Sequence, residues 1–468
     1  MNFFNSTFHN LAKYPSIRID ANYRHFFDNM NGMVWPGSDL TLSKFLTPIQ
    51  SPKISKGELQ DEYSLIDMSN VNRRYNTLCN LTSVYEIGSD KIVISEGDIV
   101  IPKMQPRLGS IFTNENHNSY LASSEFIEYT CDDSIVLPKY LFYVITHPQF
   151  SRCLFFAESG KNQRRVNSED LLRFKIPYIS IDKQKSFLKE ISSIESQIES
   201  LKLKCVHPSK LIDRVLISFF NWDIAEIERI DGLKFFFSAT SEISSQSSSI
   251  RSSARFNKLS VILDVFKSNK FEWHILEEFL IGRQTQNGWS PENSSLDDGT
   301  KIIGIDSINY DTHLDFNNPK YTSAEREDIE NFYIKENDFF ISRGNTVDLV
   351  ALASIATDVD EDIIFPDIMI RLSVDESKYS KRFLAYLFNS ILGRKYFKYS
   401  SRGKQQTMVK VSAEIVKAFQ VPLLDISVQS KLATEIEKSL SSQYELLQKI
   451  STLRDEIDTI LLKYLLNQ

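Results

Sequence analysis

The chain has 468 residues, of which 42% are hydrophobic and 25% charged, and its formal net charge at pH 7 is −7. This composition is ordinary for a soluble globular protein of two to four domains. It argues against a membrane-spanning protein, because no apolar run approaches the ~20 residues of a transmembrane helix. The negative charge argues against indiscriminate polyanion binding and still permits a local basic cleft.

The cysteines and the N-terminus indicate the compartment. Cys79, Cys131, Cys153 and Cys205 lie far apart, without a Cys-x-x-Cys pair, so free thiols are expected rather than a disulfide framework or a zinc site. The first residues have neither a basic start nor an apolar stretch, so no secretory signal is predicted. We therefore expect a cytoplasmic protein.

The first half of the chain, from about residue 16 to 179, mixes strand and helix patterns. Residues 91–94 and 98–101 alternate as strands do, and Gly97-Asp98 is the predicted turn into the second strand. Residues 138–150 and 168–173 predict helices, the latter with Ser168 as its N-cap.

A heptad seam follows Pro177. Apolar residues recur in steps of four and three, which predicts a long helix with a coiled-coil-like face. Its members are Phe187, Ile191, Ile194, Ile198, Leu201 and Cys205. Pro208 is expected to break or restart the helix, and an apolar face resumes over residues 211–220. Residues 238–253 then contain nine serines in sixteen positions, which predicts a flexible linker or an exposed loop.

The second half repeats the first. Residues 66–72, 97–103 and 160–177 recur as 305–311, 337–343 and 403–422, and the offset drifts from about 237 to 245. A period this long indicates a duplicated domain rather than a solenoid, whose repeats recur every 20–50 residues or so. The frame is repeated while the stretches between its anchors differ. This suits a protein that recognises two different things at a fixed separation.

The second copy also ends in a heptad stripe, formed by Ala433, Ile436, Leu440, Leu447, Ile450, Ile457, Leu461 and Tyr464. Gln443 and Arg454 interrupt it. Each stripe by itself is equally well explained as the core-facing side of an ordinary helix. Two stripes at equivalent places favour packing of the two helices against each other.

We therefore predict a mixed α/β (α+β) fold. It has two duplicated globular domains separated by an antiparallel, pseudo-twofold pair of long coiled-coil-like helices. The predicted segments are a first globular domain (1–180), a first spacer helix region (181–221), a serine-rich linker (222–254), a second globular domain (255–424) and a C-terminal spacer helix (425–468).

Catalytic motifs are scarce. No glycine-rich phosphate loop, S-adenosylmethionine motif or Ser/His/Asp arrangement is identifiable. Asp367, followed by Glu376 and Lys378, fits the loose pattern of metal-dependent nucleases, in which two acids and a lysine hold and activate water around Mg²⁺. The first copy has only Ser124-Glu125 at the equivalent place. A strand end followed by a solvated turn is the alternative interpretation.

Two kinds of polar segment suggest nucleic-acid recognition. The Gly-Lys-(Asn/Gln)-Gln segments combine lysine and arginine, which contact phosphates, with side chains whose paired donors and acceptors read adenine and guanine edges. Basic residues after the Gly/Asn-Asp turns form a second, parallel pair. A solvated loop before a helix is the alternative for each segment. The candidate DNA-binding residues are Lys103, Arg107, Lys161, Asn162, Gln163, Arg164 and Arg165 in the first copy, and Arg343, Arg402, Lys404, Gln405, Gln406 and Thr407 in the second.

The duplicated order of elements extends over nearly the whole chain. Its pieces are residues 18–21, 96–98, 123–126 and 160–177 with Gln184 beyond, then 338–343, 403–406 and 421–422 with Gln429 beyond. This order resembles the specificity subunit of type I restriction–modification enzymes. Such a resemblance implies two target-recognition domains, each followed by a spacer helix.

The resemblance further implies a non-catalytic subunit, each of whose target-recognition domains reads one half of a split double-stranded DNA site. The spacer helices would set the gap between the halves and dock two modification (methyltransferase) subunits and, through them, the restriction (nuclease/translocase) subunit. S-adenosylmethionine, ATP and Mg²⁺ would be bound by these partners, and this chain would hold no cofactor or metal. Two other classes stay open: a Mg²⁺-dependent nuclease or methyltransferase with an unrecognised site, and a duplicated protein scaffold without DNA binding.

Overall fold

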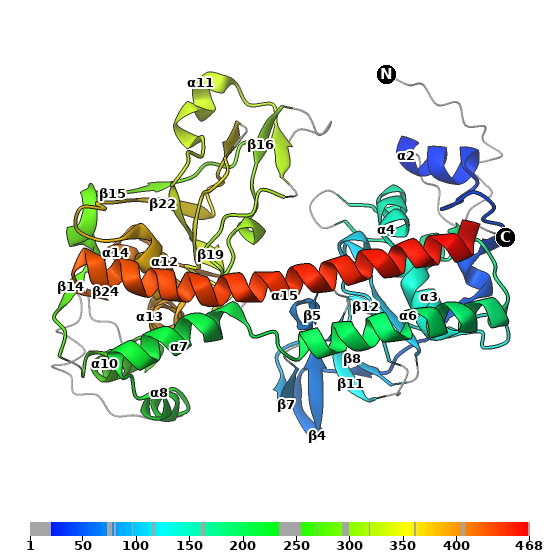
Figure 1. The fold of residues 1–468 in the computed structure, drawn as a ribbon, viewed down its shortest axis with the longest axis horizontal. Helices are drawn as coiled ribbons and strands as arrows, with labels where there is room; N and C mark the ends of the chain where they lie inside the picture. Colours follow the sequence, from blue (N-terminus) through cyan, green and yellow to red (C-terminus); the bar gives the residue numbers. More distant parts are fainter. Residues whose placement is uncertain are drawn as a thin grey trace. The chain divides into compact units, whose positions relative to one another are not determined.

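The structure is a computed structural model. It describes residues 20–72, 77–78, 81–95, 97–114, 118–160, 164–233, 254–268, 270–292, 299–317, 319–359, 362–403 and 408–466. The chain is a mixture of helices and sheets (Figure 1) and divides into two compact units. Unit 1 is Met1–Leu203 with Gln448–Gln468, and unit 2 is Lys204–Leu447. The predicted serine-rich stretch 238–253 lies outside the described residues, as do Arg18 and Ile19.

Unit 1 contains two larger sheets. A four-stranded antiparallel sheet has the order β10-β9-β12-β2, and a five-stranded mixed sheet has the order β3-β8-β11-β4-β7, in which β11 runs parallel to β4. The pairs β1–β13 and β5–β6 complete the unit. Its strands are β1 (Leu40–Thr41), β2 (Leu46–Pro48), β3 (Lys53–Ile54), β4 (Gly57–Ile66), β5 (Val71–Asn72), β6 (Thr77–Leu78), β7 (Thr82–Ile87), β8 (Lys91–Ile94), β9 (Ile99–Pro102), β10 (Phe112–Thr113), β11 (Tyr120–Ser123), β12 (Phe126–Cys131) and β13 (Lys175–Ile176). The strands predicted at 91–94 and 98–101 are confirmed as β8 and β9.

Most helices of unit 1 are short. They are α2 (Ala21–Arg24), η1 (His25–Asn29), η2 (Leu42–Lys44), η3 (Met68–Asn70), η4 (Pro106–Leu108), α3 (Pro138–Thr146), α4 (Pro148–Leu154), η5 (Phe155–Ala157), α5 (Ser168–Leu171) and α6 (Ile181–Lys202). The prediction that Ser168 caps α5 is wrong by one residue. Asn167 has the extended backbone of an N-cap, and its side chain accepts a 2.7 Å hydrogen bond from the Asp170 amide, so Ser168 is already helical.

Unit 2 is built on a four-stranded antiparallel sheet of order β15-β22-β18-β20 and a three-stranded sheet of order β17-β16-β21, in which β16 and β21 are parallel. Two further two-stranded sheets, β14–β24 and β19–β23, complete the unit. The strands are β14 (Trp273–Ile275), β15 (Leu280–Asn287), β16 (Thr300–Ile302), β17 (Lys320–Thr322), β18 (Phe339–Ser342), β19 (Gly344–Asn345), β20 (Ala353–Ile355), β21 (Ile363–Ile364), β22 (Met369–Val374), β23 (Val409–Lys410) and β24 (Gln420–Pro422).

The two four-stranded sheets place sequence-equivalent strands in the same order. β9 and β18 both follow the repeated Gly/Asn-Asp turn, and each lies between the equivalents β10/β20 and β12/β22. The turn itself is anchored alike in both units. The Asp98 carbonyl accepts from Asn114 N at 2.9 Å, and the Asp338 carbonyl accepts from Ala356 N at 2.9 Å. The repeated Gly/Asn-Asp sequence is thus explained by the turn that it forms before β9 and β18.

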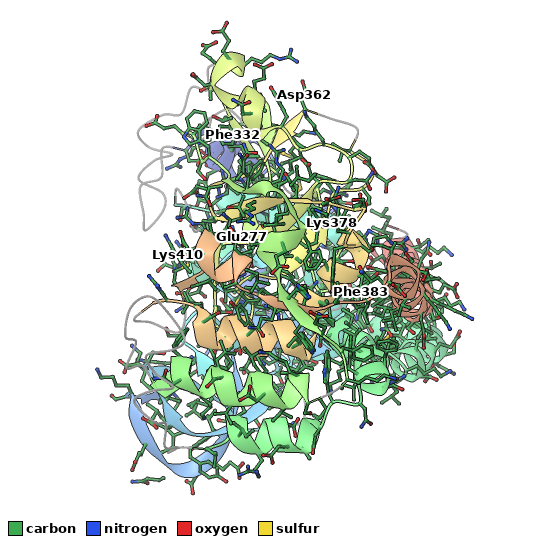
Figure 2. All side chains as sticks on the ribbon, turned by 90° about the vertical axis from the view of Figure 1, so that its left-hand side faces the viewer. Glu277, Phe332, Asp362, Lys378, Phe383 and Lys410 are labelled. Atoms are coloured by element: carbon green, nitrogen blue, oxygen red, sulfur yellow. The ribbon has the colours of Figure 1, made fainter. Side chains whose placement is uncertain are left out.

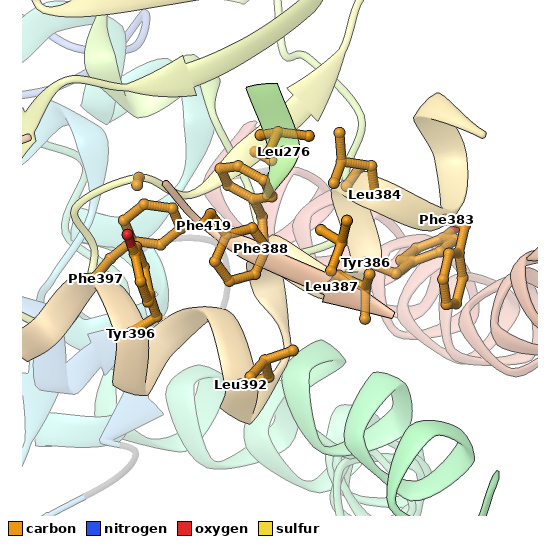
Figure 3. Packing of buried hydrophobic residues seen from close by; sticks show 14 of the residues in the cluster. Leu276, Phe383, Leu384, Tyr386, Leu387, Phe388, Leu392, Tyr396, Phe397 and Phe419 are labelled. Atoms are coloured by element: carbon orange, nitrogen blue, oxygen red, sulfur yellow. The ribbon is translucent and has the colours of Figure 1, made fainter. Parts of the chain in front are cut away.

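Unit 2 buries a large aromatic and aliphatic core between its helices and sheet. In Figure 3, Phe388 of α12 and Phe397 of α13 pack with Phe419, and the ring centroids are 4.9 to 5.3 Å apart. The helices of this unit are α7 (Pro208–Phe220), α8 (Ile224–Asp231), α10 (Ala254–Lys267), η6 (Leu276–Phe279), η7 (Ile305–Ser307), α11 (Arg326–Ile329), η8 (Glu330–Phe332), α12 (Lys381–Asn389), α13 (Ile391–Ser400), α14 (Ala413–Lys417) and the first part of α15 (Ile426–Leu466). This core holds the sheet and the inner helices as one body.

The two predicted long helices are present as α6 and the 41-residue α15. The seam predicted through Cys205 is too long, because α6 ends at Lys202, and Leu203, just beyond that end, is 88% exposed. The restart at Pro208 is confirmed, since His207 caps α7 and proline occupies the first helical position, where no amide hydrogen is needed. Among the described residues no helix is long and apolar enough to cross a membrane.

Within unit 1, α6 lies beside the last part of α15 and runs in the opposite direction (Figure 1). Phe187, near the start of α6, meets Tyr464, near the end of α15, with ring centroids 5.7 Å apart. The Tyr464 hydroxyl also donates to Glu190 at 2.9 Å. Within unit 2, Gln443 of α15 accepts a 3.1 Å hydrogen bond from Val206 N, so this polar interruption of the stripe has a backbone partner.

A buried acid in unit 2 leads to a stability prediction. Asp213 on α7 accepts a 2.6 Å hydrogen bond from Ile391 N at the start of α13, and burial raises the pKa of its carboxyl to about 6. Since this folded pKa lies above the usual aspartate value of 3.8, the contribution to stability is fully present below about pH 4 and is lost as pH rises through about 6.

We therefore expect Asp213→Asn to stabilise the protein at pH 8 by about 2 kcal/mol and to have little effect at pH 4, because the amide keeps the acceptor and removes the buried charge. Urea unfolding at both pH values measures the difference. A variant less stable than the wild type at pH 8 would show instead that Arg394, whose charge favours the ionised form of Asp213, requires the carboxylate.

Candidate nucleic-acid interface

In unit 1 the two predicted polar segments lie next to each other. β9 ends at Pro102, and the chain that follows pairs with the chain after the Gly-Lys-Asn-Gln segment. Val166 N donates to the Lys103 carbonyl at 2.8 Å, and Gln105 N donates to the Arg164 carbonyl at 3.0 Å. An isolated bridge joins Met104 to Arg165. Residues about 60 apart in the sequence therefore form one surface.

Two arginines of this surface form ion pairs with acids. Arg165 makes a two-pronged ion pair with Glu125, with nitrogen–oxygen distances of 3.0 and 3.1 Å. Arg107 pairs with the buried Glu158 at 3.0 Å. Burial raises the pKa of the Glu158 carboxyl, against the opposing effect of Arg107. The sequence predicted these basic residues as DNA-binding candidates. It did not predict that Glu125 and Glu158 pair with two of them.

Two further cations complete the cluster. The Lys103 ammonium donates to the Ser124 carbonyl at 2.6 Å, and the Arg164 guanidinium lies 5.3 Å from the centre of the Phe155 ring. An arginine over an aromatic ring is held by attraction to the ring face and keeps its outer donors available. We call Lys103, Arg107, Arg164 and Arg165 the unit 1 basic cluster.

The most distinctive predicted readers, Lys161, Asn162 and Gln163, lie outside the described residues. The chain on either side of them is well held. Ser159 N donates to the Arg165 carbonyl at 2.9 Å, and Arg165 N donates back to the Ser159 carbonyl at 2.8 Å. Gly160 has a φ of 107°, which L side chains rarely adopt. In the sequence these three residues directly precede Arg164 of the basic cluster.

Unit 2 repeats this junction with different side chains. β18 ends at Ser342, and the Arg343 carbonyl accepts from Val411 N at 2.9 Å. β19 then pairs with β23, and Arg402 and Lys410 exchange backbone hydrogen bonds of 2.9 and 2.8 Å. The predicted readers Lys404, Gln405, Gln406 and Thr407 lie outside the described residues, between Gly403 and Met408.

The unit 2 junction exposes its polar residues. Arg402 and Lys410 are exposed while Val409, next to Lys410 in β23, is buried, and Met408 is 57% exposed. The Arg343 guanidinium donates to the Asp367 carbonyl at 3.3 Å. Figure 2 shows this unit end-on, with Lys410 on the left of the view and Lys378 toward the right. We call Arg343, Arg402 and Lys410 the unit 2 basic cluster.

The alternative nuclease triad does not converge. Asp367 precedes β22 and Glu376 follows it, so a six-residue strand separates them by roughly 20 Å. Asp367 accepts from Ser290 Oγ at 2.6 Å, and Glu376 pairs with Lys381 at 3.3 Å. Lys378 pairs with Asp375. Within the described residues no group of three or more His, Cys, Asp or Glu side chains is placed to hold a metal ion.

Comparison with known proteins gives a likeness of low score. No protein-family model matches the chain, and no curated protein is similar to it. Solved structures that align with 92% of the chain, each with a TM-score of 0.32, include one described as the structural basis of complex assembly and conformational transition of the type I R-M system (12% identity, 98% of that chain), the HsdS subunit from Thermoanaerobacter tengcongensis (13%, 97%) and the type I restriction–modification system S subunit from M. genitalium (12%, 97%). A likeness at this TM-score and identity carries no argument about activity or partners.

Proposed function

We propose that the chain is the DNA specificity subunit of a type I restriction–modification complex, in which each unit reads one half of a bipartite site. The observation that supports this most is the repeated junction. In both units the segment after the Gly/Asn-Asp strand pairs with the flank of the Gly-Lys-(Asn/Gln)-Gln segment, and the side chains differ between the two. Recognition of two unlike half-sites requires this combination of one backbone arrangement and two different sets of polar side chains.

The chemistry of the two clusters fits DNA. Arginine and lysine neutralise phosphates, while asparagine, glutamine and arginine pair with base edges in the major groove. In unit 1 the basic cluster is held partly by Glu125 and Glu158, and such pairing limits nonspecific attraction to any polyanion. This agrees with a chain whose net charge is −7.

In this proposal the long helices α6 and α15 set the gap between the half-sites and dock two methyltransferase subunits. S-adenosylmethionine would come with those subunits, and ATP and Mg²⁺ with the restriction subunit that joins through them. The complex would act in the cytoplasm. The chain's own part is to bind DNA and to orient its partners.

Filter binding with duplex DNA tests the proposal against its rivals. The chain is assayed alone and together with the proteins encoded by the adjacent reading frames, among which the proposal expects a methyltransferase. We expect specific binding and adenine methylation only with the partner present. Binding of the partner without any binding of DNA would favour a protein scaffold instead.

The purified chain alone is expected neither to cut nor to methylate DNA, with or without Mg²⁺ and S-adenosylmethionine, because Asp367 and Glu376 do not share a site. Incubation of supercoiled plasmid with the chain and Mg²⁺ measures this. Cleavage by the wild type that is lost in Glu376→Ala would overturn it. Lys417→Ala, which breaks the 3.4 Å ion pair with Glu277 on the same unit, serves as the matched surface control.

A further inference from the structure

A buried glutamine occupies the same position at the start of both long helices. Gln184 is the fourth residue of α6 and is 1% exposed, and Gln429 is the fourth residue of α15 and is 0% exposed. A primary amide with no exposure must satisfy its donors and acceptor within the protein. The hydrogen-bond partners of the two amides show which segments each glutamine joins.

Each glutamine makes the same pair of backbone contacts. The carbonyl oxygen of Gln184 accepts from Leu137 N at 2.8 Å, and that of Gln429 accepts from Ser380 N at 2.8 Å. Leu137 and Ser380 are the N-cap residues of α3 and α12, the equivalent inner helices of the two units. Each glutamine therefore joins a long helix to the helix that packs within its own unit.

The amide nitrogens make the second contact. Gln184 Nε2 donates to the Ile179 carbonyl at 2.9 Å, and Gln429 Nε2 donates to the Leu424 carbonyl at 2.8 Å, in each unit five residues earlier in the chain. Gln184 Nε2 also donates to the Ile135 carbonyl at 2.9 Å. One side chain thus ties three segments together: the exit from the last strand, the first turn of the long helix and the start of the inner helix.

Only a carboxamide meets these demands. Glutamate keeps the acceptor and loses the donor, and methionine keeps the shape and loses both. The units share little sequence between their anchors, yet both retain this side chain with the same partners. A contact needed only for stability has many substitutes, whereas a contact that defines an angle between two helices is restricted to one geometry.

We propose that Gln184 and Gln429 are positioning residues that set the angle between each target-recognition unit and its long helix, and thereby the spacing at which the two half-sites are read. This inference rests on the proposed function. A small rotation at the helix displaces the far face of the unit considerably. A rotation of roughly 8° over a unit about 25 Å across moves that face by about 3.5 Å, close to the rise of one base pair. Loosening either glutamine should therefore change the gap and leave the half-sites as they are.

The test uses the full chain with its methyltransferase partner on a DNA library in which the gap length is randomised. We expect Gln184→Met and Gln429→Met to keep both half-site sequences and to raise methylation at gaps one base pair shorter or longer by about fivefold relative to the preferred gap. Gln184→Met removes three hydrogen bonds and Gln429→Met two, and fivefold matches the net contribution of about one neutral hydrogen bond. Gln184→Glu and Gln429→Glu should broaden the gap at least as much, because they place a buried carboxylate oxygen against the backbone carbonyl oxygens that the amide nitrogen now contacts.

Gln149→Met is the matched control. It removes a 2.7 Å glutamine hydrogen bond to the Val34 carbonyl inside unit 1, a contact in which neither residue belongs to a long helix. We expect it to lower the melting temperature and leave the gap unchanged. Hydrogen exchange of the folded variants verifies that the intended hydrogen bond is lost. Gln184→Met should increase exchange of the Leu137 amide and not of the Ser380 amide, and Gln429→Met should increase exchange of the Ser380 amide only.

The outcomes separate the two proposals. A wild type that directs methylation to no gapped motif overturns the proposed function and this inference with it. A wild type with a fixed gap, together with glutamine variants that lose stability and methylation but keep the same single gap, overturns the positioning role alone. Broadened gaps in the Gln149→Met control would likewise overturn it, since general loosening would then explain the effect.

Discussion

Replacing Gln163 or Arg165 by alanine is expected to alter methylation of one half-site and leave the other unchanged. Gln405→Ala and Gln406→Ala should alter only the other half. The reason is that the two basic clusters lie in different units, each attached to its own set of predicted readers. Loss of a good bidentate base contact costs about 1–3 kcal/mol of discrimination, or about 5- to 150-fold. Sequencing of methylated sites from a randomised library measures both halves at once.

Arg165 permits a sharper version of this experiment, because it is paired with Glu125. Glu125→Gln removes the acid and keeps the arginine, and it should strengthen binding to DNA by removing a negative charge from the cluster. Glu226→Gln is the control, since Glu226 makes the same two-pronged pair with Arg229 on α8, outside both clusters. If Gln163→Ala or Gln405→Ala weakened both half-sites equally, these residues would be phosphate anchors or structural residues rather than readers.

Inserting four residues into α15 between Ile450 and Arg454 is expected to lengthen or abolish the preferred gap without changing either half-site. The 41-residue helix extends about 60 Å, and four residues add about 6 Å and slightly more than one turn. Two readers on one face of B-DNA are favoured at a separation of about one turn, 34–36 Å, so we expect an unread gap of about 5–8 bp in the unmodified protein.

Mapping of methylated adenines across a genome reads this gap directly. A four-residue insertion at Ser89, in the exposed turn between β7 and β8, is the control for insertion as such. It should leave the gap as it is. A continuous motif in the wild type, or an unchanged gap after insertion into α15, would contradict a spacing role for this helix.

Local patterns were sufficient to predict several elements, including the two long helices. Alternation identified β8 and β9, the heptad stripes identified α6 and α15, and Pro208 marked the restart at α7, because each of these signals is contained in a few neighbouring residues. Where the decision depended on geometry at a single residue, prediction failed. The cap of α5 is Asn167 rather than Ser168, and α6 ends before Cys205.

The candidate site was predicted as separate basic segments rather than as a surface. Glu125 and Glu158 appear in the sequence as unremarkable acids, and nothing near them indicates that they pair with Arg165 and Arg107. Their partners are 40 and 51 residues away. Such pairings depend on which strands become neighbours.

The sequence by itself determined that one frame is used twice, with two long helices and two unlike sets of polar ends, because repetition and periodicity are properties of the linear order. Only the tertiary structure decided that each Gly-Lys-(Asn/Gln)-Gln flank pairs with the end of a distant strand. It also decided that Gln184 and Gln429 join each long helix to its unit. The physical reason is that a backbone group or an amide accepts whichever partner the packed sheet and helices bring within hydrogen-bonding distance, and no local pattern encodes that choice.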